Sequence, residues 1–371
     1  MLVIVHTAIS AWRMLDAVRL LESDARLQVV FTMAPGVVNT GLEELLIANG
    51  GVVMPWQLVT PLTFDAALAA DYAAVHEVRA PLLVMPHEAS LNRMTRRAVR
   101  VAGGGVVYGL DQQRLMRDSR AMPAAILLTH EAERTRLARA HPDLLPLATV
   151  TGDSSYDRLV ASLPLRDFYR RALGVGAGRK LVVVASTSGL RASSARAYAL
   201  LRRVVADLPA REYHVLALFP ADMTPSRRSG LSASLRHGLS LMPPEADWRA
   251  PLVAADWIIS DYGPVAPYGA VAGTPVLLYG RPSDDFDANS SLGELAKVAP
   301  RLSARRSTRT QLRRAARKYR SDHHQRVIGR ITSEPERCNR ILRRLLYRTL
   351  GLPQPATIPT TDPVSPPFRI D

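Results

Sequence analysis

The chain has 371 residues, of which 47% are hydrophobic and 22% are charged, as in a globular protein with room for about two domains. Its single cysteine, Cys338, excludes a disulfide framework and fits a reducing cytoplasm. No apolar run reaches the ~18 residues of a membrane span. Residues 1–10 lack the charged start and long apolar stretch of a signal peptide. We therefore expect a cytoplasmic protein.

The formal net charge of +15 is concentrated near the C-terminus. Residues 301–348 hold sixteen Arg or Lys and three acids, a net +13, so the rest of the chain is close to neutral. A basic tail of this kind does not indicate a nucleic-acid-binding face across the fold, and no nucleic-acid-reading motif accompanies it. Nucleic acid is therefore the least favoured partner.

In the first 165 residues, short apolar runs alternate with segments of helical periodicity. The expected helices cover residues 9–23 and 41–48. The expected strands cover residues 2–6, 27–32, 52–55, 81–85, 103–108 and 124–128, with a further short apolar run at 64–70. Such alternation predicts βα units around a parallel sheet. We assign residues 1–165 to an N-terminal Rossmann-like domain.

A second series of the same kind follows a glycine-containing join, and we assign residues 166–300 to a second Rossmann-like domain. Its expected strands cover residues 181–185, 214–219, 239–242, 257–260 and 276–279. Its expected helices cover residues 192–206, 248–255 and 264–272. Residues 301–350 are expected to form long basic helices. The proline-rich residues 351–371 are expected to be extended or disordered.

The run from Trp257 to Tyr279 is the most informative part of the sequence. An apolar strand ends before Asp261, Tyr262 and Gly263 form a tight turn, and Pro264 stands where proline suits the first turn of a helix. The N–H groups at a helix N-terminus suit a phosphate, and ligands of open α/β sheets sit beyond the carboxyl ends of strands. The alternative is an ordinary βα turn without a ligand.

Four segments, in order along residues 80–280, resemble one known family. Residues 255–280 resemble its strand, Asp-Tyr turn, helix and Gly-x-Pro-Val run, and residues 150–159 resemble its domain-junction motif. Residues 82–94 are similar to its strand with a following histidine, and residues 182–191 to its strand with a threonine loop. The family is the CDP-glycerol glycerophosphotransferase (teichoic acid polymerase-like) group of GT-B enzymes, and the chain resembles its short actinobacterial members.

The resemblance implies a GT-B-like α/β fold, in which two Rossmann-type parallel-sheet domains face a cleft, followed here by a basic helical C-terminal segment. The N-terminal domain would hold a hydroxyl acceptor, and the C-terminal domain a nucleotide-diphosphate-linked donor such as CDP-glycerol or a nucleotide sugar. The implied reaction moves a sugar or polyol-phosphate group from donor to acceptor, in a cell-surface polymer or natural-product pathway. The donor is a substrate, so no cofactor is implied. No metal is required, because helix dipoles and N–H groups can stabilise the leaving group.

The candidate catalytic residues are His87 and Glu88, which follow a predicted strand. The resemblance implies that His87 is the general base that deprotonates the acceptor hydroxyl, a role that suits an imidazole. Glu88 would act as the base itself or orient His87. The alternative is a histidine that caps the strand by bonding to backbone.

The candidate donor-binding residues follow the strands of the second domain. They are Ser186, Thr187, Ser188, Asp261, Tyr262 and Gly263. The three hydroxyls would donate to a phosphate, and Asp261 would hold a ribose or orient the turn, with a strand-end cap as its alternative.

Two further groups have structural interpretations. We expect Gly152, Asp157 and Arg158 to pin the interdomain junction rather than touch substrate. His323 and His324 have no third ligand at suitable spacing, so we assign no metal site to the chain.

The sequence departs from the family at phosphate-facing positions. Gly263 and Pro264 replace paired serines, Phe219 replaces a histidine, and Glu88 replaces a glycine. These changes favour a second hypothesis, a catalytically degenerate GT-B-like protein that binds a ligand or a partner. A third option, a nucleotide-sugar 2-epimerase of the same fold, would need a set of acidic and histidine groups that the sequence does not offer.

The basic residues 301–350 have two main interpretations. One is a solvated, salt-bridged helical face, and the other is peripheral attachment to an anionic membrane surface on the inner side of the membrane. Residues 338–350 mix apolar side chains with arginines in an amphipathic pattern, which suits either lipid or packing on the N-terminal domain.

Overall fold

The structure is a computed structural model that describes residues 1–36, 41–85, 94, 109–117, 120–186, 191–218, 238–243, 245–284 and 286–369. The chain divides into two compact units. Unit 1 comprises Met1–Asp157, Asp284–Ser290 and Arg330–Thr361, and unit 2 comprises Arg158–Ser283, Ser291–Gly329 and Asp362–Asp371. In the described part of the chain, every helix is too short or too polar to cross a bilayer.

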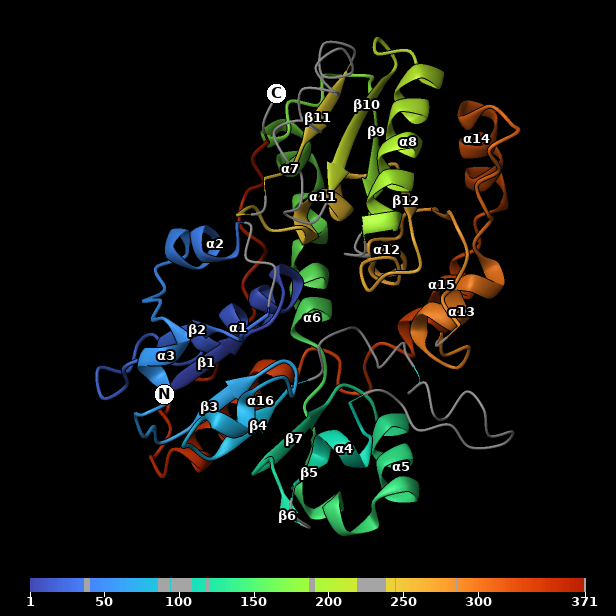
Figure 1. Cartoon of the computed structure of the whole chain (residues 1–371). Helices are drawn as coiled ribbons and strands as arrows, with labels where there is room; N and C mark the ends of the chain where they lie inside the picture. The colour runs from blue at the N-terminus through green and yellow to red at the C-terminus, as the bar shows by residue number, and fades with distance from the viewer. Residues whose placement is uncertain are drawn as a thin grey trace. The chain divides into compact units, whose positions relative to one another are not determined.

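Unit 1 is built on a six-stranded parallel sheet in the order β2-β1-β3-β4-β7-β8 (Figure 1). The strands are β1 (Leu2–Val5), β2 (Val30–Met33), β3 (Ala67–Ala69), β4 (Leu82–Val84), β7 (Ala125–Leu128) and β8 (Ala148–Val150). All four residues of β1 are buried, which explains the uninterrupted apolar run at the start of the sequence. Strands of a sheet with both faces covered are continuously apolar in sequence, because neither face of the sheet meets water.

The helices of unit 1 are short, and one comes from the far end of the chain. They are α1 (Ala8–Arg19), α2 (Leu42–Ala48), α3 (Trp56–Val59), α4 (Gln112–Leu115), α5 (Glu131–Ala140) and α16 (Cys338–Thr349), together with 3-10 turns Val75–Glu77 and Pro142–Leu147. A two-stranded hairpin, β5 (Met116–Arg117) and β6 (Arg120–Ala121), completes the unit. Thr7 and Ser10 form a capping box that begins α1 directly after β1.

Unit 2 contains a five-stranded parallel sheet in the order β11-β10-β9-β12-β13 (Figure 1). The strands are β9 (Lys180–Ala185), β10 (Tyr213–Leu218), β11 (Leu239–Leu241), β12 (Trp257–Ser260) and β13 (Val276–Leu278). Counted within the unit, this order is 3-2-1-4-5, as in a Rossmann sheet. The order reverses between β9 and β12, so the topological switch point lies at the carboxyl ends of these two strands.

The helices of unit 2 flank this sheet. They are α7 (Arg166–Ala172), α8 (Arg191–Asp207), α11 (Arg249–Ala254), α12 (Tyr268–Val271), α13 (Ser291–Val298), α14 (Thr308–Lys318) and α15 (Ser321–Ile328), with a 3-10 turn Leu163–Leu165. Helix α6 (Ser154–Ser162) begins in unit 1 and ends in unit 2.

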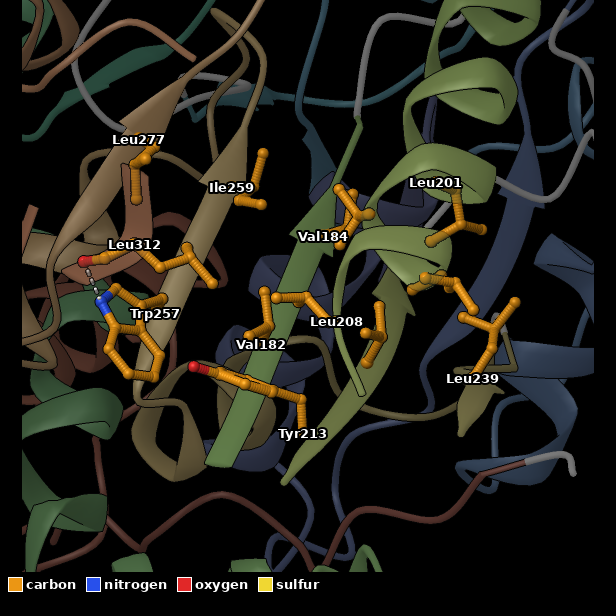
Figure 2. Packing of buried hydrophobic residues seen from close by; sticks show 14 of the residues in the cluster. Val182, Val184, Leu201, Leu208, Tyr213, Leu239, Trp257, Ile259, Leu277 and Leu312 are labelled. Carbon is orange, nitrogen blue, oxygen red and sulfur yellow. Dashed lines mark hydrogen bonds between the residues drawn. The ribbon is translucent and has the colours of Figure 1, made fainter. Parts of the chain in front are cut away.

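The core of unit 2 is mainly aliphatic, as the low aromatic content predicts. Val182 and Val184 of β9 lie among leucines of α8 and β11, and the Trp257 ring lies near Tyr213, with ring centroids 6.3 Å apart (Figure 2). Trp257 Nε1 donates to the carbonyl of Leu312 at 2.9 Å, which ties α14 to the start of β12. A buried indole N–H that finds a partner of this kind adds packing without an unpaired donor.

The expected helix over residues 264–272 is wrong in its start: α12 begins at Tyr268. Residues 263–267 instead form successive turns, in which the N–H of Ala266 donates to Gly263 O and that of Tyr268 to Val265 O. Proline has no N–H, so Pro267 cannot donate to Gly263 O as an α-helix requires. The missing N–H of Pro267 therefore explains why α12 begins only at Tyr268.

Other differences are smaller. Residues 52–55 form only an isolated bridge from Val53 to Phe31, and the strand expected at 103–108 lies outside the described residues. Residues 301–350 form helices, as expected, but α14 and α15 belong to unit 2 and α16 to unit 1. Helix α16 contacts α1 and buries three leucines, so apolar packing outweighs its charge. Residues 352–369 contain neither helix nor strand.

Candidate functional site

A buried polar pair marks the topological switch point of unit 2. Ser186 follows β9 and Asp261 follows β12, and Ser186 Oγ donates to Asp261 Oδ2 at 3.1 Å. The two residues are 3% and 7% exposed. The register of the strands causes this meeting, because Ser260 pairs with Ala185 and the residues after them emerge together. Carboxyl ends at a switch point form the usual ligand crevice of such sheets.

Tyr279 extends this pair, although sequence reasoning did not single it out. It directly follows β13, and its backbone N–H donates to Ser260 O at 3.0 Å. Its hydroxyl is buried, and the Ser186 side chain lies within its reach as a hydrogen-bonding neighbour. Burial, and next the charge of Asp261, raise the pKa of Tyr279 above its ordinary range, so the hydroxyl stays protonated. Its place in the sequence could have identified it, because Tyr279 directly follows β13 and Asp261 directly follows the neighbouring strand β12.

The turn after Asp261 is built tightly. Gly263 and Pro264 are buried, and Tyr262 is half-buried. The four-residue α12 that follows gives no standard helix N-terminus at Gly263, so the predicted phosphate site at a helix start is not supported by this geometry. Only loop N–H groups and nearby side chains remain to bind a ligand there.

Two glycines explain the rest of this motif. A Cβ on Gly269 would lie 2.5 Å from Val276 Cγ2, so glycine lets α12 pack directly on the sheet. Gly273 has φ +67° and ends α12, where the N–H of Thr274 donates to Gly269 O at 3.0 Å. Gly269 therefore allows close packing, and Gly273 allows the chain to reverse after α12.

The junction residues hold C-terminal segments. Gly152 has φ +82°, and a Cβ there would lie 2.8 Å from Glu334 O. In unit 1, Asp157 accepts from the N–H groups of Glu336 at 2.7 Å and Cys338 at 3.1 Å, at the start of α16. Burial raises the pKa of Asp157 to about 7. Asp157 therefore caps a helix far away in sequence.

In unit 2, Arg158 performs a similar task for the proline-rich tail. Arg158 Nη2 donates to Pro363 O at 2.8 Å, Ser162 Oγ accepts from the N–H of Val364 at 2.9 Å, and Tyr169 Oη donates to Val364 O at 2.7 Å. Val364 is buried. The last part of the tail, from Asp362 onward, is thus held as a part of unit 2.

The remaining candidates divide as follows. His87, Glu88, Thr187 and Ser188 lie outside the described residues, as does Phe219. His324 is buried against Tyr319, and burial, followed by the charge of His323, lowers its pKa to about 4. His324 therefore packs as a neutral ring. Among the described residues, no three His, Cys, Asp or Glu side chains gather in a way that could hold a metal ion.

No protein-family model matches the sequence, and a search of curated proteins finds no match. Solved structures are similar over nearly the whole chain. The wall teichoic acid polymerase TagF has a TM-score of 0.61 at 11% identity, covering 95% of this chain and 89% of that chain. A putative UDP-N-acetylglucosamine 2-epimerase from Listeria monocytogenes has a TM-score of 0.54 at 14% identity, covering 97% and 99%. MnaA of S. aureus, in a co-structure with UDP, has a TM-score of 0.58 at 13% identity, covering 96% and 99%.

These similarities confirm the predicted fold class. The chain has a GT-B-like α/β fold with two parallel sheets of six and five strands, like TagF and MnaA. The likeness in structure extends across both units, although sequence identity is low.

Proposed function

We propose that the chain is a GT-B-type transferase that moves a sugar or polyol-phosphate group from a nucleotide-diphosphate donor to a hydroxyl acceptor. The observation that carries the proposal is the buried group of Ser186, Asp261 and Tyr279 at the switch point of a Rossmann-ordered sheet. TagF has been soaked with CDPG and MnaA has been solved with UDP, and both have the fold of this chain.

In the proposed complex, unit 2 holds the donor. Asp261 accepts a hydrogen bond from a hydroxyl of the ribose or of the transferred group, and Ser186 orients Asp261 through its 3.1 Å hydrogen bond. Tyr279 donates a hydrogen bond from its protonated hydroxyl to an oxygen of the nucleotide-linked donor. Thr187, Ser188 and the backbone at Gly263 are the proposed diphosphate ligands.

The proposed chemistry begins on the acceptor, which unit 1 holds. His87 removes the proton of the acceptor hydroxyl, with Glu88 as its orienting group or as the base itself. The acceptor oxygen then bonds to the transferred group as the bond to the nucleotide breaks, and the nucleotide leaves with that electron pair. Hydroxyls and N–H groups stabilise the leaving phosphate without requiring a metal.

Calorimetric titration with CDP-, UDP- and GDP-linked donors tests this proposal. We expect one donor class to bind, and we expect Asp261→Asn to weaken that binding by about tenfold or more, because a charge-assisted hydrogen bond is lost. Absence of binding by every donor would contradict the proposal. Asp256→Asn is the matched control: this carboxylate is also in unit 2, but it pairs with Arg166 and Arg170 at the opposite end of β12.

Two other functions would give distinct results. The similar 2-epimerases favour conversion of a nucleotide sugar, which would proceed without any acceptor. A catalytically degenerate binding protein would bind a donor or a partner, yet release no nucleotide when acceptors are added. Measurement of nucleotide release and of sugar conversion, with and without acceptor, separates the three.

We also propose that an anionic membrane surface is a partner of residues 301–350. Arg313, Arg314, Arg317 and Lys318 of α14 are exposed, and no ion pair within the described residues includes them. Basic residues near an anionic surface contribute about 1 kcal/mol each. Flotation with vesicles containing anionic lipid should show binding that falls with added salt. Binding unaffected by Arg313→Ala with Arg314→Ala would contradict this part.

A further inference from the structure

A hollow on unit 1 carries an unusual pair of charges. It has a volume of about 470 Å³ and lies beside the β5–β6 hairpin. Arg117 and Arg120 both line it, and these two residues are direct partners in the antiparallel ladder. Directly opposite side chains on such a ladder lie about 5 Å apart at Cβ, and like charges there are destabilising.

Within the described residues, no acidic side chain pairs with these two arginines. Both are exposed. The third arginine nearby, Arg114, is satisfied separately by Asp111 at 2.8 Å. His76 adds a further nitrogen-bearing side chain to the wall of the hollow. The hairpin therefore places two arginines opposite each other, and a bound anion would offset the repulsion between their charges.

The rest of the hollow fits a small organic molecule. Its walls include the apolar side chains of Val75, Leu82 and Met122, and Val75 and Leu82 belong to the buried core. A second hollow of about 500 Å³ shares His76, Arg117 and Met122 with it, and Asp71 lines that second space. The hollow thus combines basic and apolar lining residues, and Asp71 lines only the second hollow.

We propose that this hollow, formed by Arg117, Arg120 and His76, is a binding site for the phosphate group of a small phosphorylated molecule. Guanidinium groups bind phosphate oxygens through paired N–H donors, and a tetrahedral anion between two such groups removes their repulsion. The apolar wall would contact the carbon skeleton that carries the phosphate. The site needs only unit 1, so it does not depend on the reaction proposed for the donor crevice.

Titration of the full chain with inorganic phosphate at constant ionic strength tests the proposal. Arg117→Ala with Arg120→Ala should abolish measurable binding, since each lost arginine weakens it by about tenfold. Replacement of both by lysine should restore part of it, because lysine keeps the charge without the paired donors. The matched control is Arg340→Ala with Arg344→Ala on α16, which removes two exposed charges from the same unit and should leave phosphate binding unchanged.

Two further measurements keep the test decisive. Asp261→Asn should not alter phosphate binding at this hollow. This result would distinguish failure of the phosphate-site proposal from failure of the donor-site proposal. The double alanine variant should be at least as stable as the wild type without phosphate, because it removes a like-charge pair. Equal binding of phosphate and acetate, equal loss in the α16 control, or no phosphate binding by the wild type would overturn the proposal.

Discussion

Replacement of Gly269 by alanine tests how the turn after β12 is supported. The new Cβ would lie 2.5 Å from Val276 Cγ2 and 2.9 Å from Ile258 Cδ1. Both side chains are buried, so neither can move into solvent. Overpacking of this kind costs about 1–3 kcal/mol, whereas alanine gains at most about 1 kcal/mol in helix propensity over glycine. We therefore expect unit 2 to lose about 1–2 kcal/mol in its free energy of unfolding.

Urea unfolding, together with hydrogen exchange of the β12 and β13 amides, measures this loss. The matched control is Gly176→Ala, whose Cβ would meet only Arg179 Cδ at an ordinary 3.7 Å, and whose effect should stay within about 0.5 kcal/mol. In a Val276→Ala background the cost of Gly269→Ala should shrink, because the closest clashing methyl is gone. A Gly269→Ala variant as stable as the wild type would refute the packing argument.

Three other changes have defined outcomes. Tyr279→Phe should weaken donor binding by about tenfold with little change in stability, and an unchanged calorimetric affinity would count against its role. The wild type should lose stability as pH rises from about 4 to about 7, because the raised pKa of Asp157 means that ionisation of this carboxyl disfavours the folded state. Asp157→Asn should remove this loss, and urea midpoints of both proteins across that pH range would measure the difference. Parallel curves for the two proteins would contradict this assignment. Tyr169→Phe should cost about 0.5–1.5 kcal/mol and speed hydrogen exchange at Val364, whereas unaltered exchange would mean that the tail is held by other contacts.

The strands of unit 2 could be predicted from sequence because burial on both faces leaves a simple signal. Residues 181–185 and 257–260 are continuous apolar runs, and they form β9 and β12 with nearly the predicted bounds. Helix α5 gave no such signal, since it buries only Glu133 and Leu137 among ten mostly polar residues. The strand β8 is short and only half-buried, so its pattern is also weak.

The candidate site was predictable in part for a similar reason. Ser186 and Asp261 could be placed at strand ends individually, because each follows an apolar run. Their hydrogen bond depends on the register between two strands that lie 75 residues apart in sequence, and Tyr279 joins them through a third strand. The delayed start of α12 depends on which N–H groups Pro264 and Pro267 remove, and a helical pattern of apolar residues does not reveal this.

The central claim is that the crevice at the carboxyl ends of β9, β12 and β13 holds a nucleotide-diphosphate-linked donor. The most direct measurement is hydrogen exchange of the full chain with and without the best-binding donor, repeated for Asp261→Asn. Donor should slow exchange in the backbone after Ala185, after Ser260 and after Leu278 in the wild type, and the protection should be lost in the variant. Protection confined to other segments, or retained in full by Asp261→Asn, would contradict the claim.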